Sequence, residues 1–197
     1  MSLLDADGTR LLGALRLLLA DKAIATPEEI AERIALTDQA SPKRGAALVA
    51  RAWCDPAFRA LLLADGTAAA ESLGISLRGL PPLGVLENTE ALHHLVVCTL
   101  CSCYPRAVLG YPPFWFKSAA YRARAVRDPH GLLAEWNTVL PEGQRIRVVD
   151  STADYRWMVL PRRPAGTEGW DEERLAALLD EGHLIGVTVP SVTEVAA

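Results

Sequence analysis

The chain has no long run of basic residues. Its 197 residues carry 20 Lys and Arg against 24 Asp and Glu, which gives a formal net charge of −4. Proteins that bind nucleic acid need a cationic face to neutralise phosphates. Arg122, Arg124 and Arg127 alternate with apolar residues, as expected for one face of a helix that is solvated, contacts a partner or pairs with Asp128 and Glu135. We therefore expect no nucleic-acid partner.

The chain also lacks an unbroken apolar stretch that could cross a membrane. The apolar run 11–20 contains Arg16, whereas a membrane-spanning helix needs about 20 consecutive, mostly apolar residues. Residues 1–7 have no basic segment of the kind that opens a secretory signal. We expect no membrane association and a cytoplasmic location.

Cysteine is scarce and unevenly distributed. Of the four cysteines, Cys98, Cys101 and Cys103 fall within six residues. In a chain without an export signal, such clustering indicates metal binding rather than disulfide bonds. The fourth, Cys54, lies in a predicted helix and is expected to be a small core residue.

Half of the residues are hydrophobic and 22% are charged, so the chain can bury a core. The first 80 residues carry helix signals. Leucines recur at helical spacing in residues 11–19. Cap-plus-proline pairs occur at Thr26-Pro27, with a capping-box Glu29, and at Ser41-Pro42 and Asp55-Pro56. Gly74 is expected to end the last of these helices.

From residue 81 the pattern changes to short apolar runs separated by Gly, Pro and Asp. It predicts strands at 85–86, 95–97, 145–150, 156–160 and 183–189, and helices at 114–124, 129–136 and after Asp171. The predicted fold class is α+β. A helical arm, residues 1–80, precedes a layered, mixed α/β domain, residues 81–197, that carries the cysteine loop.

The spacing CxxCxC can place three sulfurs around one ion if the chain curls into a claw. Structural zinc takes four N or S ligands, and an iron–sulfur cluster takes a fourth cysteine. His93 and His94 could complete a zinc site, but from an incoming strand their side chains are expected to point away and pack. Three thiolates with the backbone amides of Ser102 and Cys103 would leave one open position. The ligand field of these five donors suits low-spin trivalent cobalt or iron that acts as a Lewis acid. Spacing alone leaves zinc or another soft metal open.

The segment Cys98-Thr99-Leu100-Cys101-Ser102-Cys103, hereafter the claw, resembles the metal-binding motif of nitrile hydratase α subunits. The motif also occurs in the related metal subunit of thiocyanate hydrolase. Further segments resemble the same family, and the resemblance runs from about residue 10 to residue 190; these segments are residues 86–89, 109–117, 121–129, 147–154 and 158–170.

The resemblance implies the ligands and the chemistry of the site. The metal would be held by the sulfurs of Cys98, Cys101 and Cys103 and by the backbone amides of Ser102 and Cys103. Cys101 would carry a sulfinate and Cys103 a sulfenate, so the implied catalytic residues are Cys101, Ser102 and Cys103. Thr99 and Tyr104 match the cobalt-type pattern, which implies Co(III), with Fe(III) as the alternative.

The implied reaction hydrates a small-molecule nitrile to its amide, which is the reaction of a hydro-lyase. The chain would act in a hetero-oligomer with a β subunit or its split equivalent, whose arginines would face the oxidised cysteines. It would be inactive alone, and a maturation helper would insert the cobalt. Thiocyanate hydrolase and a zinc-binding assembly module without chemistry remain alternatives.

The chain departs from the family pattern beside the claw. Arg106 stands where many members have tryptophan, so it is a candidate pocket residue that could read a polar, bulky or anionic substrate or pair across the subunit interface. Trp115 is a second pocket candidate, with a core role as the alternative. Phe116 replaces a commoner tyrosine and is expected to pack only. With the short arm, these departures fit a dedicated heteroaromatic nitrile, as in the toyocamycin nitrile hydratases.

Overall fold

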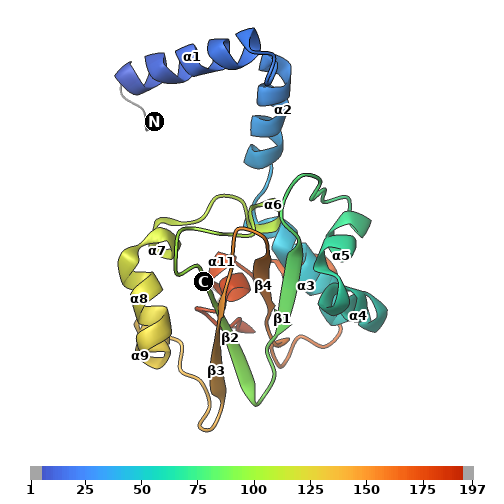
Figure 1. The fold of residues 1–197 in the computed structure, drawn as a ribbon. Helices are drawn as coiled ribbons and strands as arrows, with labels where there is room; N and C mark the ends of the chain where they lie inside the picture. The colour runs from blue at the N-terminus through green and yellow to red at the C-terminus, as the bar shows by residue number, and fades with distance from the viewer. Residues whose placement is uncertain (1–5, 193–197) are drawn as a thin grey trace. The chain divides into compact units, whose positions relative to one another are not determined.

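The computed structural model describes residues 6–192, with every side chain in that range except that of Leu36. The chain divides into two compact units, the first up to Gln39 and the second from Ala40 onward (Figure 1). No helix in the described range is both long enough and apolar enough to span a membrane.

The first unit consists of two helices, α1 (Ala6–Asp21) and α2 (Pro27–Asp38). The predicted capping box opens α2: the Glu29 amide donates to Thr26 Oγ1 at 3.1 Å, and the Thr26 amide donates to Glu29 Oε2 at 2.8 Å. Helix α1 has no buried residue, and all of its leucines except Leu19 are exposed. The leucine periodicity thus correctly predicts a helix, and the apolar face of this helix is exposed to solvent.

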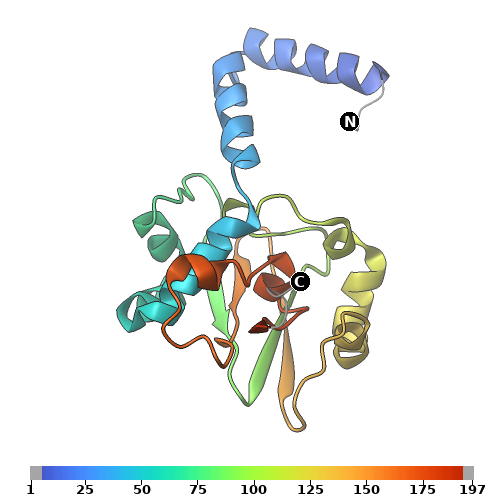
Figure 2. The ribbon, with the colours of Figure 1, turned by 180° about the vertical axis from the view of Figure 1, so that it is seen from behind.

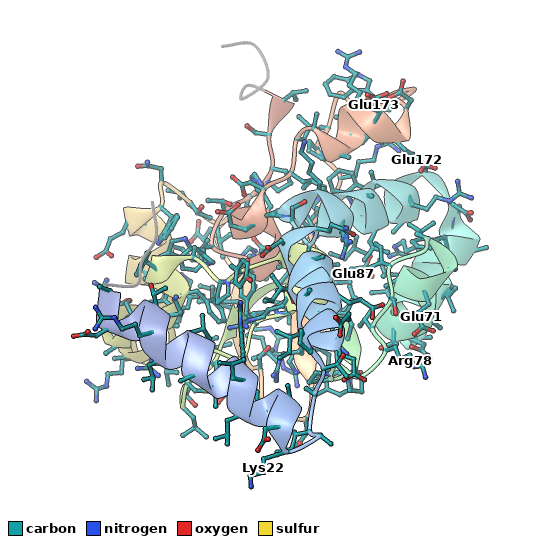
Figure 3. The ribbon with its side chains drawn as sticks, turned by 90° about the horizontal axis from the view of Figure 1, so that it is seen from above. Lys22, Glu71, Arg78, Glu87, Glu172 and Glu173 are labelled. Atoms are coloured by element: carbon teal, nitrogen blue, oxygen red, sulfur yellow. The ribbon has the colours of Figure 1, made fainter. Side chains whose placement is uncertain are left out.

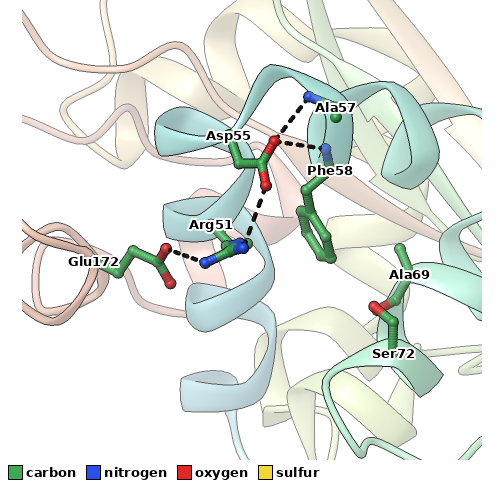
Figure 4. Close-up of polar contacts among 7 residues, drawn as sticks. All are labelled: Arg51, Asp55, Ala57, Phe58, Ala69, Ser72 and Glu172. Atoms are coloured by element: carbon green, nitrogen blue, oxygen red, sulfur yellow. Dashed lines mark hydrogen bonds and ion pairs between the residues drawn. The ribbon is translucent and has the colours of Figure 1, made fainter.

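The second unit opens with three helices, α3 (Pro42–Cys54), α4 (Pro56–Ala64) and α5 (Gly66–Ser72). The predicted proline starts of α3 and α4 are confirmed. Asp55 caps α4 by accepting from the amides of Ala57 and Phe58, while its other oxygen accepts from Arg51, which also binds Glu172 (Figure 4). Cys54, expected in the core, is instead exposed, because it ends α3 on the solvent side.

The division between the units falls earlier in the chain than the predicted boundary at residue 80. Helices α3 to α5 bury Leu48, Val49, Leu62 and Ala69 in the same core as the strands. A helix that contributes to a shared core belongs to the same compact body as its packing partners. Residues 40–80 therefore join the strand-bearing part of the chain.

The strands form two parallel pairs, β1 (Leu83–Glu87) with β4 (Arg156–Leu160), and β2 (Leu92–Val97) with β3 (Arg145–Asp150). The strands predicted at 85–86, 95–97, 145–150 and 156–160 are thus confirmed. A tight turn, in which the Thr89 amide donates to the Leu92 carbonyl, joins β1 to β2, and the two strands form a V at the base of Figure 1. The carboxyl end of β2 therefore lies at the same edge as the amino ends of β1 and β4.

Helices cover the strands on several sides. Helices α4 and α5 lie beside β1, and the short helices α7 (Phe114–Lys117), α8 (Ala119–Arg127) and α9 (Pro129–Glu135) lie beside β2 and β3 (Figure 1). From behind, α11 (Glu181–Ile185) lies over β2 and β4, and α10 (Glu172–Ala176) packs on α3 (Figure 2). Glu172 and Glu173 stand in the first turn of α10 (Figure 3), where acidic side chains complement the helix dipole.

Two predictions for the second unit need correction. The expected helix 114–124 is two helices, because Ser118 adopts an extended conformation and caps α8 through the Tyr121 amide at 3.0 Å. The expected strand 183–189 is wrong: residues 181–185 form α11, opened by a capping box between Asp180 and His183. The helix predicted after Asp171 forms with Asp171 as its N-cap and ends at Ala176.

Candidate metal centre

The claw begins where β2 ends. Val97 pairs with Asp150 at the carboxyl ends of the parallel strands β2 and β3, and Cys98 is the next residue. Carboxyl ends of parallel strands meet at one edge, so the loop that leaves β2 starts beside the end of β3. The strand pair therefore places the first cysteine next to a carboxylate that lies 52 positions further along the chain.

Asp150 holds the first turn of the claw. The Thr99 amide donates to Asp150 Oδ1 at 3.0 Å, and the Thr99 hydroxyl donates to Asp150 Oδ2. On the other side of β2, the buried Tyr121 donates its hydroxyl to the Val96 carbonyl at 2.7 Å. The end of β2 and the start of the claw are thus held to β3 and to α8 by hydrogen bonds. The contact of Asp150 with Thr99 was not predicted, because the spacing of residues in the sequence does not reveal which strands pair in parallel.

The three thiols of the claw converge. The sulfur of Cys101 lies 3.4 Å from that of Cys98 and 3.2 Å from that of Cys103. All three sulfurs lie within 4.8 Å of one another, and the Cys101 amide donates to the Cys98 sulfur at 3.3 Å. Cys98 and Cys103 are buried and Cys101 is exposed. Three soft donors on one short loop can hold one metal ion from a single side.

The surroundings of the thiols shift the pKa values of Cys101 and Cys103 in opposite directions. Burial raises the pKa of Cys103 to about 12, and hydrogen bonds with Cys101 and Cys98 act in the same direction, while the positive charge of Arg156 opposes the shift. The pKa of Cys101 is lowered, first by hydrogen bonds with the Cys103 and Cys98 thiols and then by the backbone amides of Ser102 and Cys103. Of the two thiols, Cys101 is the one that ionises first.

A cavity of about 360 Å³ opens beside the claw. Its wall includes Cys101, Ser102 and Cys103, Arg106 from the short helix α6 (Arg106–Leu109), and Leu83 and Arg156 from the starts of β1 and β4. The opposite directions of β1 and β2 bring these residues to one edge of the strands. Nη1 of Arg156 has no hydrogen-bond partner in the described part of the chain. The cavity thus combines thiols, cations and an apolar wall.

The other predicted residues lie away from the sulfurs. His93 and His94 are buried and hydrogen-bond to Asn88, and His93 Nε2 also meets the Gly186 carbonyl at 2.8 Å. They pack rather than join the thiol cluster, as expected. Trp115 contacts the rings of Phe116, Tyr121 and Trp136 and is not among the described residues that line the cavity. Phe116 is fully buried, as the packing prediction requires.

Fold and site together define a protein that presents a three-thiol loop, able to hold one soft metal ion, at the edge of a mixed α/β domain. The family model described as "Nitrile hydratase, alpha chain" matches residues 7–188. The chain belongs to this family, as the resemblance of the claw predicted.

Individual relatives agree with that assignment. The low-molecular weight cobalt-containing nitrile hydratase subunit alpha of Rhodococcus rhodochrous is 48% identical over 179 residues, which are 90% of this chain and 86% of that one. A double mutant of the Fe-type nitrile hydratase from Comamonas testosteroni Ni1 has a TM-score of 0.84 at 42% identity, covering 95% of this chain and 92% of that chain. A recombinant thiocyanate hydrolase with partially modified cobalt centres has a TM-score of 0.87 at 39% identity, covering 95% and 91%.

Proposed function

We propose that this chain is the catalytic, metal-binding subunit of a nitrile hydratase, which hydrates a nitrile to the corresponding amide at a low-spin Co(III) centre. The convergence of three thiols on one loop, in a chain 48% identical to a cobalt-containing α subunit, carries the proposal. The proposed ligands are the sulfurs of Cys98, Cys101 and Cys103 and the backbone amides of Ser102 and Cys103.

The donor set supports an octahedral ion over tetrahedral zinc. Three thiolates and two backbone amides make five donors and leave one open position, whereas structural zinc takes four N or S ligands. The backbone amides of Ser102 and Cys103 would supply nitrogen donors of a kind that structural zinc sites do not use.

A bound trivalent ion in this donor set would supply a Lewis acid at the wall of the cavity. Cys101 would carry two added oxygen atoms as a sulfinate, and Cys103 would carry one as a sulfenate. The sulfenate oxygen of Cys103 would act as the nucleophile or as the base when water adds across the carbon–nitrogen triple bond. The unpartnered nitrogen of Arg156 is suited to the negative charge that Cys103 would carry as a thiolate or as a sulfenate.

The site needs a second polypeptide. Cys101 is exposed and the neighbouring Leu100 is 90% exposed, so the outer side of the claw is bare on this chain. A β subunit, or two chains that together replace it, would cover that side and bring arginines to the oxygens of Cys101 and Cys103. The isolated chain is then inactive. A maturation helper delivers the cobalt before the partner closes over the site, and the assembly works in the cytoplasm.

Arg106 is the residue that we propose selects the substrate. It lines the cavity beside Cys103, and its guanidinium lies 5.8 Å from the centroid of the Tyr111 ring. A cation at this position favours a nitrile that carries hydrogen-bond acceptors, such as a heteroaromatic one, over a simple aliphatic nitrile. Because Trp115 packs in the aromatic cluster, the substrate proposal rests on Arg106 alone.

Hydrolysis of thiocyanate is the second candidate function. Two arginines, Arg106 and Arg156, line the cavity next to the thiols, and such a pair suits a small anion. The match to a thiocyanate hydrolase at a TM-score of 0.87 supports the same reading. The two candidates share the metal centre and differ in the substrate and in the reaction, which is hydration of a nitrile in one case and hydrolysis of a small anion in the other.

The test is metal analysis and peptide mass spectrometry on the chain co-purified with its partner from cobalt-supplemented cells. We expect one cobalt per chain, two oxygens on Cys101 and one on Cys103. Zinc with three unmodified thiols in the assembled complex would overturn the proposal in favour of an assembly module without chemistry. Activity assays with acrylonitrile, a heteroaromatic nitrile and thiocyanate then separate the substrates: acrylonitrile turned over far faster than the others would refute the role of Arg106.

A further inference from the structure

One arginine of α8 reaches the claw from outside the cavity. Nη1 of the half-buried Arg122 donates to the backbone carbonyl oxygen of Cys101 at 3.2 Å. The sequence offered a solvated helix face, a partner contact or ion pairs with Asp128 and Glu135 for the arginines of this helix. The structure instead ties Arg122 to the peptide group in the middle of the claw.

The contact differs from that of its neighbour on the same helix. Arg124 is paired with two carboxylates, Asp128 at 3.2 Å and Glu135 at 2.6 Å. Arg122 forms no ion pair with a carboxylate within residues 6–192. No acidic side chain among the described residues therefore neutralises its positive charge, and this charge acts on the carbonyl that Arg122 contacts.

That carbonyl belongs to the peptide whose nitrogen is the amide of Ser102. A peptide group is planar and nearly always trans, so its oxygen and its N–H point to opposite sides. Arg122 holds the oxygen on the outer side, so the Ser102 N–H points to the opposite side of the peptide, away from Arg122. The contact thus sets the orientation that a nitrogen ligand at residue 102 requires.

The same contact acts on the charge of the peptide. Resonance in the peptide group shares electron density between nitrogen and oxygen. When the nitrogen binds a metal as an anionic ligand, part of the negative charge resides on the oxygen. A guanidinium that donates to this oxygen forms a charge-assisted hydrogen bond, which is stronger than a neutral one.

We propose that Arg122 is a positioning residue of the metal centre, which orients the Cys101–Ser102 peptide and stabilises the charge that this peptide carries when its nitrogen binds the ion. The inference rests on the proposed function, because it takes the Ser102 amide as a ligand. Arg122 needs no contact with substrate, and it lies outside the residues that line the cavity.

The experiment compares four variants of the full-length, reduced chain for binding of Co(II). Binding is measured by competition with a chromogenic chelator, and the sulfur-to-cobalt charge-transfer band is recorded for each chain. Arg122→Met removes both donor and charge, Arg122→Gln keeps a neutral donor, and Arg122→Lys keeps the charge. The matched control, Arg124→Met, removes an arginine of the same helix that does not contact the claw.

We expect Arg122→Met to bind Co(II) about 10- to 100-fold more weakly than wild type, in the range seen when a partner of a metal ligand is removed. Its charge-transfer band should shift, because the nitrogen donor changes. Arg122→Lys should keep the wild-type band, Arg122→Gln should bind with intermediate affinity and a shifted band, and Arg124→Met should behave as wild type.

Wild-type affinity and an unchanged band in Arg122→Met would overturn the inference while leaving the proposed function intact. An equal loss in Arg124→Met would also overturn it, because the effect would then come from the helix as a whole. If the wild-type chain co-purified with its partner holds zinc and three unmodified thiols, the proposed function fails, and the inference fails with it. Thermal unfolding of each variant checks that a loss of binding is not a loss of fold.

Discussion

Asn88, His93 and His94 form a buried polar group at the base of β1 and β2. The Asn88 side-chain oxygen accepts from the His94 amide at 2.7 Å, and its side-chain nitrogen lies 3.1 Å from His93 Nδ1. Because His93 Nε2 donates to the Gly186 carbonyl, Nδ1 is the acceptor, and the ring is the neutral tautomer. A proton on Nδ1 would face the Asn88 amide donor, so the packing of this residue requires an uncharged ring.

The first prediction concerns the pH dependence of stability. Burial lowers the pKa of His93, against the hydrogen bond to Gly186, and lowers that of His94 together with the charges of Arg147 and His93. Below about pH 6.5 the unfolded chain takes up protons that the folded chain does not. The free energy of unfolding should therefore fall as the pH drops from about 7 through the unfolded pKa. Denaturant titrations at several pH values measure it.

His130, which is exposed on α9, provides the control. The slope of unfolding free energy against pH should become shallower in His93→Gln and should be unchanged in His130→Gln. An equal slope in wild type and His93→Gln would show that the buried ring is not the source of the pH dependence.

At the scale of the element, α11 is the instructive case. The sequence of residues 183–189 is a short apolar run, and such a run is compatible with a buried strand or a buried helix. The Asp180 carboxylate accepts from the His183 amide, and the Asp180 amide donates to His183 Nδ1, both at 3.1 Å, which starts a helix. Gly186, at φ +86°, ends it in the left-handed region. The caps at both ends of the segment thus determine that it forms a helix and not a strand.

The second prediction tests the end of α11. A Cβ at position 186 would lie 2.0 Å from the backbone oxygen of His94 in β2, in addition to the left-handed backbone. We expect Gly186→Ala to lower the free energy of unfolding by about 3–5 kcal/mol, the sum of overpacking and left-handed strain. Gly143, at φ +83° with nothing within 4 Å of its Cβ position, is the control. Gly143→Ala should cost only about 1–2 kcal/mol. Equal losses in denaturant titrations would rule out the steric contact with β2.

At the scale of the whole molecule, two compact units differ in how they are stabilised. The core of the second unit is built from residues 48–187, drawn from helices and strands that meet around β1 to β4. Helix α1 buries no residue, and its exposed leucines include Leu11 at 72% and Leu17 at 75%. A helix without tertiary packing is marginal in water. The stability of the chain therefore resides in the second unit.

The third prediction removes residues 1–39. Because the core of the second unit includes none of them, we expect chain 40–197 to unfold cooperatively, with a free energy within about 1 kcal/mol of the full chain. Denaturant unfolding followed by tryptophan fluorescence measures this, since all five tryptophans lie after residue 40. A truncated chain that unfolds without cooperativity would mean that the first unit completes the core.

Much of the site and most of the elements followed from the sequence alone. Cys98, Cys101 and Cys103 are so close in the chain that covalent geometry keeps their sulfurs together, and the caps at Thr26 and Asp55 act over three residues. Only the tertiary structure brought Asp150, Arg156 and Arg122 to the claw, placed Cys54 in solvent, and joined residues 40–80 to the strands. Spacing along the chain determines local contacts, whereas strand pairing and helix packing determine which distant residues meet, because they depend on the burial of many apolar side chains at once.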